Sequence, residues 1–461
     1  MKKNFFWLIS WIFIYLTLGI VFIVNYTDNQ QMKQNYMVLL ITYFFVAGIL
    51  LLLYLNTNMD IFEPIVFVTF LYLMIFCIAP MCNIINGDIL FFGVDVMQGT
   101  IKATFIFVIS YISFLIAYYL KKDNVVEFKE ITYVKFSNER KREMFKIALM
   151  LWIICYLFTL IYMVSTGKNI FYILTLGIKG EVFKDEMSAT PLGFISMFSY
   201  SLIPTWMYIY AYGESKLLKI ITFALTISGF ILRGFRFIII IYMLAPIIFY
   251  YIKKKKYPSM KVIISLSIVI IILIGAIGFS RGGLRSGIEI EWSKFGGEAI
   301  SYAIKGNFDI YQPFYGMVEV IPQYRQYSYG KEMFIYTLVM FIPRIIWPSK
   351  PGPLLHEILS LSVNKSAADS GSAFPNIGEF YFEFGVIGCI IFMFLFGFLC
   401  RKAKKLYRSK NINDNKIIAY SIILPTLMQI IIRGYIPSNF YLCIFLLMPI
   451  LIISKLSFIK S

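Results

Sequence analysis

The sequence predicts an all-α, polytopic membrane protein with about twelve transmembrane helices and one large extracytoplasmic loop that contains short helices. Composition is the first observation, because 59% of the 461 residues are hydrophobic and only 15% are charged. With a mean hydropathy of +0.75, an ordinary soluble domain is excluded. The second observation is that apolar segments recur with about the 20 residues that a helix needs to cross roughly 30 Å of hydrocarbon. These segments are 5–24, 36–55, 64–82, 101–120, 146–165, 193–212, 217–232, 235–252, 261–279, 379–400, 416–432 and 440–457.

The distribution of lysine and arginine predicts the orientation of these helices. The segment 5–24 follows an N-terminal Lys-Lys pair and lacks the cleavage pattern of a secretory signal, so we expect it to remain as the first anchor. An even number of crossings places both termini on one side, and the positive-inside rule assigns that side to the cytoplasm. On this topology the basic loops 121–146 and 401–416 and the run Lys253–Lys256 are cytoplasmic.

The connections divide the chain into three parts of a single membrane domain. Residues 1–279 hold the first predicted helices, residues 280–378 form the large outer loop, and residues 379–461 hold the last helices. The loop is rich in aromatic residues, so we expect it to fold over the outer membrane face rather than to be disordered. Within it, MFIYTLVMFIPRIIW at 333–347 is too short to cross the bilayer, and an interfacial or re-entrant helix is predicted there.

The formal net charge of +18 identifies a partner once the topology is known. In a soluble protein this excess would suggest nucleic acid. Here the basic clusters adjoin the predicted cytoplasmic ends of helices, where they orient the protein and contact anionic lipid. Membrane lipid is therefore an expected partner, and nucleic acid is not.

Arginines on the predicted outer face lie at helix ends and in turns, next to glycine or proline in LRGFRF, SRGGLRSG, IPRIIW and IIRGY. A guanidinium group binds phosphate oxygens through two hydrogen bonds, and glycine lets backbone N–H groups approach an anion closely. For any single arginine, snorkelling to the interface explains its position equally well. As a group they indicate an anionic substrate, and a lipid-linked diphosphate carries its charge at this depth. These residues are Arg233, Arg236, Arg281, Arg285, Arg344 and Arg433.

Two places on the outer face offer a general base. Glu379 begins the tenth predicted span with Glu383 one turn further along the same face, although acidic residues there also suit the helix dipole without any catalytic role. His356 is the only histidine, and an unperturbed pKa of about 6.5 suits proton transfer, but a lone surface histidine is more often incidental. The other acidic residues of the loop are too dispersed to predict a metal site, so neither a metal nor another cofactor is expected.

Three stretches of the chain resemble a known family. LRGFRFIIII at the start of a span, PRIIWPSKPGP late in the outer loop and GSAFPNIGEFYFEFGVIG before the next span are similar to bacterial O-antigen or capsule repeat-unit polymerases of the Wzy type. That family is part of the wider group of polytopic, lipid-dependent glycosyltransferases related to O-antigen ligases. The resemblance implies a GT-C-like enzyme of the bacterial cytoplasmic (inner) membrane whose active site faces the periplasm or exterior. The implied reaction joins oligosaccharide repeat units carried on undecaprenyl diphosphate into O-antigen or capsular polysaccharide.

Roles for the candidate residues follow from that implied reaction. Arg236 and Arg433 would stabilise charge on the leaving diphosphate, because preorganised cations in a poorly hydrated cleft act most strongly on the transition state. Glu379 or His356 would accept the proton of the attacking hydroxyl. The resemblance also implies a chain-length regulator and a flippase as partners. The residues expected to bind the substrate are Arg233, Arg281, Arg285, Arg344 and Glu383.

Two alternatives remain at this point. An O-antigen ligase would use the same donor with a different acceptor, and a functional outer-loop histidine is typical of ligases. The residues around His356, HEILSLSVNKS, do not reproduce the expected ligase pattern. A carrier of lipid-linked oligosaccharides would place its charged groups along a central path, whereas the arginines here gather at one face, which favours an enzyme.

Overall fold

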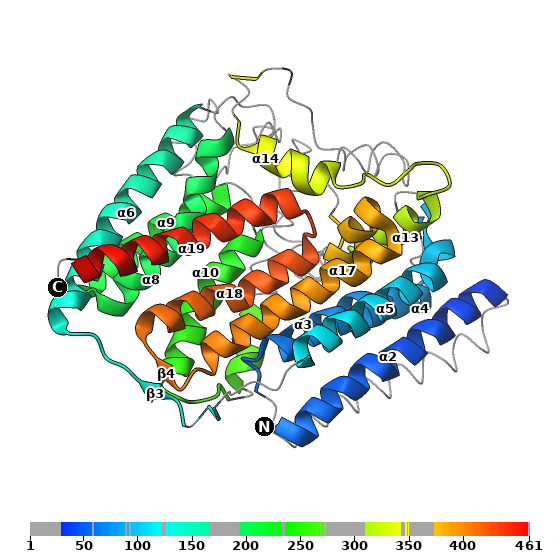
Figure 1. Cartoon of the computed structure of the whole chain (residues 1–461), viewed down its shortest axis with the longest axis horizontal. Coiled ribbons are helices and arrows are strands. Elements are labelled where there is room, and N and C mark those ends of the chain that lie inside the picture. Colours follow the sequence, from blue (N-terminus) through cyan, green and yellow to red (C-terminus); the bar gives the residue numbers. More distant parts are fainter. Residues whose placement is uncertain are drawn as a thin grey trace, which may run out of the picture.

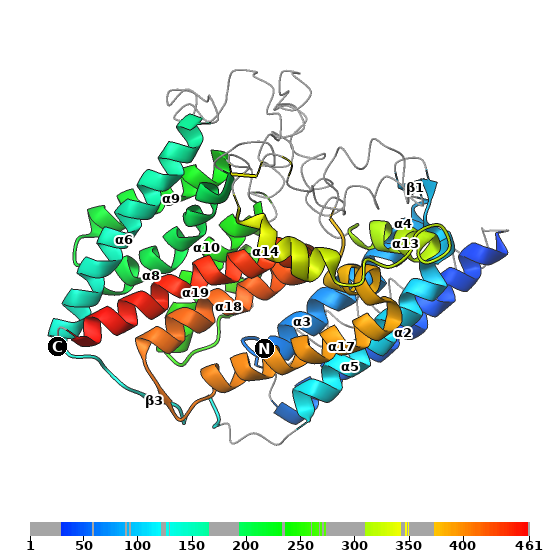
Figure 2. The same cartoon turned by 45° about the horizontal axis from the view of Figure 1, so that its top comes forward.

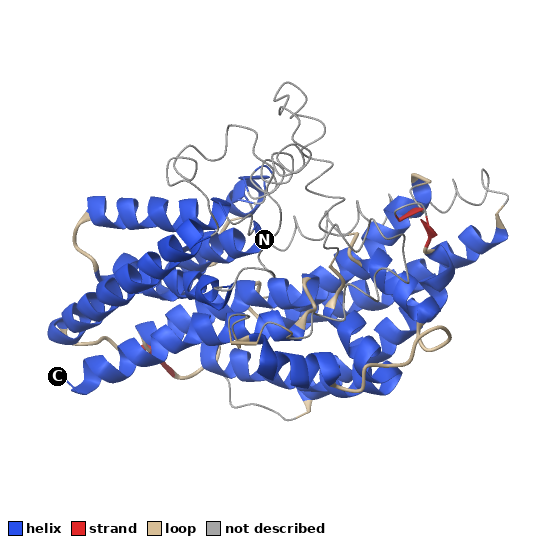
Figure 3. Ribbon diagram, turned by 90° about the horizontal axis from the view of Figure 1, so that it is seen from above, coloured by secondary structure: helices blue, strands red, loops and turns tan. Residues whose placement is uncertain are grey.

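The computed structural model describes residues 29–57, 60–87, 90–91, 94–120, 126–128, 130–165, 193–232, 236–259, 261–266, 268–269, 272, 309–342, 346–347, 349 and 373–459. These parts are almost entirely helical (Figure 3). Seven of their helices are long and apolar enough to cross a membrane, and a further apolar helix over Phe237–Lys253 is shorter. The all-α polytopic membrane fold is thereby confirmed. The number twelve is not confirmed. Segment 5–24 and most of segment 261–279 lie outside the described residues, and the predicted spans 193–212, 217–232 and 235–252 are not among the seven. The seven candidate spans are Gln30–Leu55, Pro64–Ile85, Met97–Tyr119, Asn138–Val164, Asn376–Tyr407, Asp414–Ile432 and Ile436–Phe458.

The first group of helices packs against the long helix α17. Gly397 of α17 approaches α5 so closely that a Cβ atom there would lie 2.3 Å from the carbonyl oxygen of Phe114. A side chain at this position would separate the two helices, so the glycine sets their distance. The helices of this group are α2 (Gln30–Thr57), α3 (Pro64–Leu73), the π-helical η1 (Met74–Ile78), α4 (Ala79–Ile85), η2 (Met97–Gly99) and α5 (Thr100–Tyr119).

A second group lies on the opposite side of α18 (Figure 1). Buried polar contacts join its members, since the Trp152 indole N–H donates to Thr226 at 3.0 Å and the Ser201 hydroxyl donates to the carbonyl of Phe445 at 2.8 Å. Buried bonds of this kind fix the register between neighbouring helices. The group contains α6 (Asn138–Ser165), η4 (Gly193–Ser201), α8 (Leu202–Tyr212), α9 (Lys216–Leu232), α10 (Arg236–Lys253) and α19 (Ile436–Ile459).

Helices α17 (Asn376–Tyr407) and α18 (Asp414–Ile432) form an antiparallel pair between the two groups. Their connection contains β4 (Asn411–Ile412), which pairs in parallel with β3 (Thr132–Tyr133). The basic loops 121–146 and 401–416, both predicted to be cytoplasmic, therefore lie together at one end of the pair. A second small sheet pairs β1 (Leu90–Phe91) with β2 (Val94–Asp95).

The described part of the large loop lies across the other end of the bundle. It forms α13 (Tyr311–Val320), the π-helical η6 (Lys331–Tyr336) and α14 (Thr337–Met340), which cover the ends of α17 and α19 (Figure 2). With six residues in η6 and four in α14, this helical segment is about 15 Å long. That is about half of the hydrocarbon thickness, as predicted for an interfacial or re-entrant segment.

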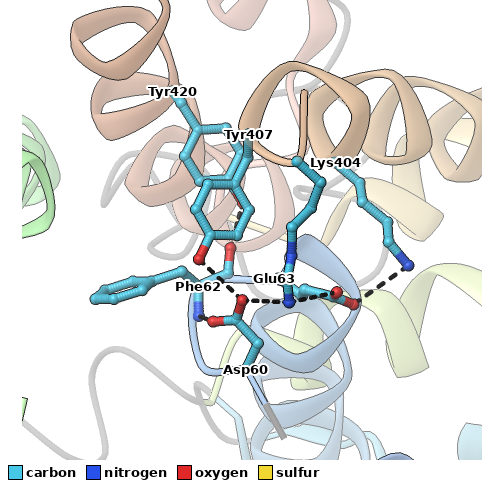
Figure 4. A network of polar contacts seen from close by, with 7 residues as sticks. Asp60, Phe62, Glu63, Lys404, Tyr407 and Tyr420 are labelled. Atoms are coloured by element: carbon cyan, nitrogen blue, oxygen red, sulfur yellow. Dashed lines mark hydrogen bonds and ion pairs between the residues drawn. The ribbon is translucent and has the colours of Figure 1, made fainter. Parts of the chain in front are cut away.

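The end of α17 near β4 is held by a buried network of charges, which we call the inner network (Figure 4). Arg408 lies 2.7 Å from Asp60 and 3.2 Å from Glu63, and Lys404 lies 3.4 Å from Glu63. Tyr407 donates its hydroxyl to Asp60 at 2.9 Å. Side-chain exposure is 2% for Asp60 and 10% for both Glu63 and Arg408. The network fixes the connection between α2 and α3 to the last turn of α17.

Candidate active site at the outer end of the bundle

Four of the predicted site residues fall within the described parts of the chain, and all four lie at the end of the α17–α18 pair that is opposite the inner network. They are Arg236, of which only the backbone is described, Glu379, Glu383 and Arg433. The other predicted site residues lie outside the described residues. These are Arg233, Arg281, Arg285, Arg344 and His356.

Arg433 brings the end of α18 to the beginning of α10. Its guanidinium carbon lies 5.5 Å from the centroid of the Phe237 ring, a distance typical of a cation–π contact. Phe237 follows Arg236, the first residue of α10. The tertiary structure therefore places Arg433 beside the N-terminal turn of α10, where unpaired backbone N–H groups and the helix dipole favour anions.

A tight turn fixes the backbone next to Arg433. The N–H of Gly434 donates to the carbonyl of Phe374 at 2.9 Å. A Cβ atom at Gly434 would lie 2.4 Å from the Cα of Asn376 and 2.5 Å from its nitrogen. Only glycine fits this approach of two backbones. The predicted approach of an anion to the backbone beside the arginine stays a prediction.

Helix α17 is interrupted close to its N-terminal end. Phe384 and Gly385 have non-helical backbone angles, and Gly385 has φ of +63°, a region that favours glycine. The break separates a short helix, residues 376–383, from the long part that continues to Tyr407. All residues of the short helix are buried, so it is part of the protein interior and carries Glu379 and Glu383 with it.

Glu379 binds the beginning of α19 through one of its two carboxylate oxygens. Its Oε2 accepts the N–H of Ile436, the first residue of α19, at 2.5 Å. Its Oε1 is buried, and among the described residues it has no hydrogen-bond partner. A buried carboxylate oxygen normally has a partner, so this atom can accept a proton, or a hydrogen bond from a hydroxyl group of a ligand.

Glu383 differs, because backbone groups occupy both of its oxygens. Oε2 accepts the N–H of Gly330 at 2.6 Å, and Oε1 accepts the N–H of Met333 at 2.9 Å. Glu383 is fully buried, with 0% of the residue exposed. The two glutamates that looked equivalent in the sequence therefore make different contacts.

Glu332 and Tyr435 join this site, and the sequence did not predict either of them. The hydroxyl of Tyr435 donates to Oε1 of Glu332 at 2.8 Å, and Glu332 is 2% exposed. Burial, together with the charge of Glu332, raises the pKa of Tyr435 above its ordinary value, so the phenol stays protonated and remains a donor. We call Glu332, Glu379, Glu383, Arg433 and Tyr435 the outer cluster.

The outer cluster combines a guanidinium group with carboxylates in a largely buried setting, which suits stabilisation of a developing anion together with proton transfer. The only sequence signal for Tyr435 is its position two residues after Arg433. Glu332 had been considered only as one of the dispersed acids. Within the described residues, no group of three or more His, Cys, Asp or Glu side chains is arranged to hold a metal ion.

Comparison with known proteins gives the family. Searches of curated proteins and of solved structures return no match to the chain. A family model described as O-antigen polysaccharide polymerase Wzy matches residues 7–461, which is essentially the whole chain. The chain therefore belongs to the O-antigen polysaccharide polymerase family Wzy, and it is a glycosyltransferase that joins lipid-linked oligosaccharide repeat units.

Proposed function

We propose that the polymerase joins repeat units carried on undecaprenyl diphosphate, at the outer face of the bacterial cytoplasmic membrane, and that Arg433 and Glu379 of the outer cluster, together with Arg236, are its catalytic residues. The observation that carries this proposal is the contact of Arg433 with Phe237. It brings together two arginine-bearing elements, the end of α18 and the start of α10, that are far apart in the sequence. A diphosphate would meet cations and helix N–H groups there.

In the proposed reaction, the oxygen of a sugar hydroxyl on one repeat unit attacks the anomeric carbon of the glycan on another carrier. The bond between that carbon and the diphosphate oxygen breaks, and the diphosphate leaves with the electron pair. Arg433 and Arg236 stabilise the negative charge that develops on the leaving oxygen. The proton of the attacking hydroxyl goes to Oε1 of Glu379, the oxygen without a partner among the described residues.

The substrate-binding roles of Arg233, Arg281, Arg285 and Arg344, and the alternative base His356, stay part of the proposal. A flippase that supplies the lipid-linked units and a chain-length regulator are its proposed partners. An O-antigen ligase would share the donor site, so the acceptor distinguishes the two enzymes. A carrier that only moves lipid-linked oligosaccharides breaks no bond and would need no general base.

The deciding experiment supplies the purified, reconstituted protein with undecaprenyl diphosphate repeat units and follows the ladder of longer lipid-linked glycans. Arg433→Ala and Glu379→Gln are expected to lower the rate by about 10²- to 10³-fold, and Arg236→Ala should behave in the same way. The control is Arg142→Ala, an exposed arginine near the start of α6. Normal elongation by Arg433→Ala would refute the assigned site, and transfer only to a lipid A core would identify a ligase.

The proposed orientation, with both termini in the cytoplasm, has its own test. Tyr324, in the large outer loop, is 81% exposed. Lys410, next to β4 at the other end of the bundle, is also exposed. In cells with a permeable outer membrane and an intact cytoplasmic membrane, a membrane-impermeant maleimide should label Tyr324→Cys. It should not label Lys410→Cys. The reverse pattern would place the outer cluster in the cytoplasm and end the proposal.

A further inference from the structure

The break in α17 creates hydrogen-bond acceptors that the outer loop uses. Because residues 384 and 385 leave the helical conformation, the carbonyls of Phe382 and Glu383 point away from the helix ladder. They accept the N–H groups of Ser328 at 3.0 Å and Tyr329 at 2.9 Å. Tyr327 packs against Gly385 so closely that a Cβ there would lie 2.8 Å from its ring.

The carboxylate of Glu383 completes this attachment. It accepts the N–H groups of Gly330 and Met333, which lie at the start of η6, and Gly330 has the left-handed φ of +86° that the turn requires. Four backbone N–H groups of the loop are thus bound at one interruption of a membrane helix. We call this arrangement, Ser328–Met333 bound to Phe382 and Glu383, the outer clasp.

The clasp is joined to the turn that carries Arg433 by a side-chain hydrogen bond. Glu332, within the clasp, accepts the hydroxyl of Tyr435 at 2.8 Å, and Tyr435 is two residues from Arg433. The intervening Gly434 lies against Asn376 without space for a methyl group. The turn that carries Arg433 is therefore held between the short helix of α17 on one side and η6 on the other.

We propose that Glu383, Glu332 and Tyr435 are positioning residues that hold the Arg433 turn in its reactive geometry, with Glu383 acting through the clasp. Glu383 was predicted to bind substrate, but both of its oxygens serve the loop, which favours a role through other residues. This inference rests on the proposed function of Arg433. It adds that the large outer loop takes part in the reaction by fixing a residue of a membrane helix end.

The first test compares two tyrosines that bind the described helices of the outer loop. Tyr435, just before α19, binds Glu332 of η6, and Tyr441, within α19, binds Thr337 of α14. Tyr435→Phe removes the bond to Glu332, whereas Tyr441→Phe removes an equivalent 2.8 Å bond to the carbonyl of Thr337 that does not involve the Arg433 turn. Tyr435→Phe should lower kcat at least about tenfold with KM changed less than about threefold. Tyr441→Phe should leave kcat within about twofold, at an equal thermal stability.

Conservative replacements provide a second readout. Glu332→Gln keeps an oxygen that accepts the Tyr435 hydroxyl, so kcat should stay near the native value, whereas Glu332→Leu should match Tyr435→Phe. Glu383→Gln has one acceptor oxygen for two N–H donors and should also lower kcat about tenfold or more. If Glu383→Gln fails to fold, the Tyr435 and Glu332 variants still decide the question.

Coupling to Arg433 completes the experiment. If Tyr435 acts by positioning Arg433, then Tyr435→Phe should cost little further activity in an Arg433→Lys background. Multiplicative losses would show that Tyr435 acts independently and would overturn the proposal. If Tyr435→Phe is fully active while Arg433→Ala has lost activity, only the positioning role is overturned. If Arg433→Ala is fully active, the proposed catalytic site is overturned, and the positioning role with it.

Discussion

The outer cluster and the inner network both bury carboxylates at an end of α17, but they bind them differently. In the inner network, Asp60 and Glu63 face Arg408 at 2.7 Å and 3.2 Å. In the outer cluster, backbone N–H groups hold Glu379 and Glu383 in the described part of the chain. Among the described residues, ion pairs hold the carboxylates of the inner network and the atom without a partner there is the donor Nε of Arg408, whereas in the outer cluster it is a carboxylate oxygen of Glu379. We infer that the first arrangement serves structure and the second serves chemistry.

The inner network illustrates why such pairing is structural. Burial raises the pKa of Asp60, although Arg408 opposes this shift, so holding the charged pair away from water is itself costly. Breaking a pair of this kind leaves an uncompensated buried charge, which costs more than the pair contributes. Single substitutions should therefore affect folding at the inner network and catalysis at the outer cluster.

The largest expected effect is that of Arg408→Ala. Its removal leaves two buried carboxylates without their shared cation, and the free energy of unfolding should fall by about 3–5 kcal/mol. Denaturant titration in detergent micelles measures this change. The turnover of the folded fraction should stay native, in contrast to Arg433→Ala, which should fold normally and lose turnover. Equal stability losses for the two variants would abolish the distinction.

Gly434→Ala should be next in size. A Cβ atom 2.4 Å from the Cα of Asn376 has no space, so the turn and Arg433 must move, and a shift of about 1 Å can cost about 10²-fold in rate. The ladder assay measures the loss. Gly48→Ala in α2, where nothing lies within 4 Å of the new atom, is the control and should elongate normally. Native turnover of Gly434→Ala would mean that the turn geometry is not required.

Tyr407→Phe should have a moderate effect on stability alone. The substitution removes the 2.9 Å hydrogen bond to Asp60 but leaves Arg408 in place, so the free energy of unfolding should fall by about 1 kcal/mol. Tyr119→Phe, at a ring that is 54% exposed, is the matched control. A loss of turnover in folded Tyr407→Phe would indicate that the inner network also influences catalysis.

Lys404→Gln should have the smallest effect. Its ammonium lies 3.4 Å from Glu63 with 18% side-chain exposure. Glu63 keeps its contact with Arg408 at 3.2 Å when Lys404 is replaced, so the loss should lie at the low end of the range of about 0–1 kcal/mol. In the same denaturant titration, the free energy of unfolding of Lys404→Gln should differ from the native value by less than about 0.5 kcal/mol. A change as large as that of Arg408→Ala would mean that Lys404 is an equal member of the network.

Hydropathy predicted the seven candidate spans of the described residues, because the apolar length that a bilayer requires can be read from the sequence. The predicted span 193–212 is instead the 3-10 helix η4 followed by the short helix α8. Helix α17 was expected from residue 379 and begins at Asn376. Its interruption at Gly385 was not predicted, since GEFYFEFGVIG reads as one apolar run. The ring of Tyr327 in the outer loop packs against Gly385, and no local pattern indicates this contact.

The candidate site was predictable in its residue types but not in its contacts. Arg433 and Gly434 were predicted from their adjacency in IIRGY as part of an anion site, which stays a prediction, and the approach of Gly434 to the backbone of Asn376 was not predicted. Glu379 and Glu383 could not be distinguished, because their spacing places both on one helix face and only tertiary contacts separate their roles. The bond between Tyr435 and Glu332 joins residues 103 positions apart, and it arises from the docking of η6 on the helix ends.

The interruption of α17 also divides the helix into a short buried part and a long, partly exposed part. The short helix 376–383 is bound to the outer loop and, through Asn376, to Tyr72 of α3 at 3.0 Å, while the long part from residue 386 carries the exposed apolar side chains that meet lipid. A bilayer of different thickness tilts lipid-facing helices to match it. The short helix contacts the long part across the break, through the Cys389 thiol and the carbonyl of Ile377 at 3.5 Å and through the stacked rings of Phe380 and Phe392. We therefore expect the thickness of the surrounding membrane to influence the position of Glu379 beside α19.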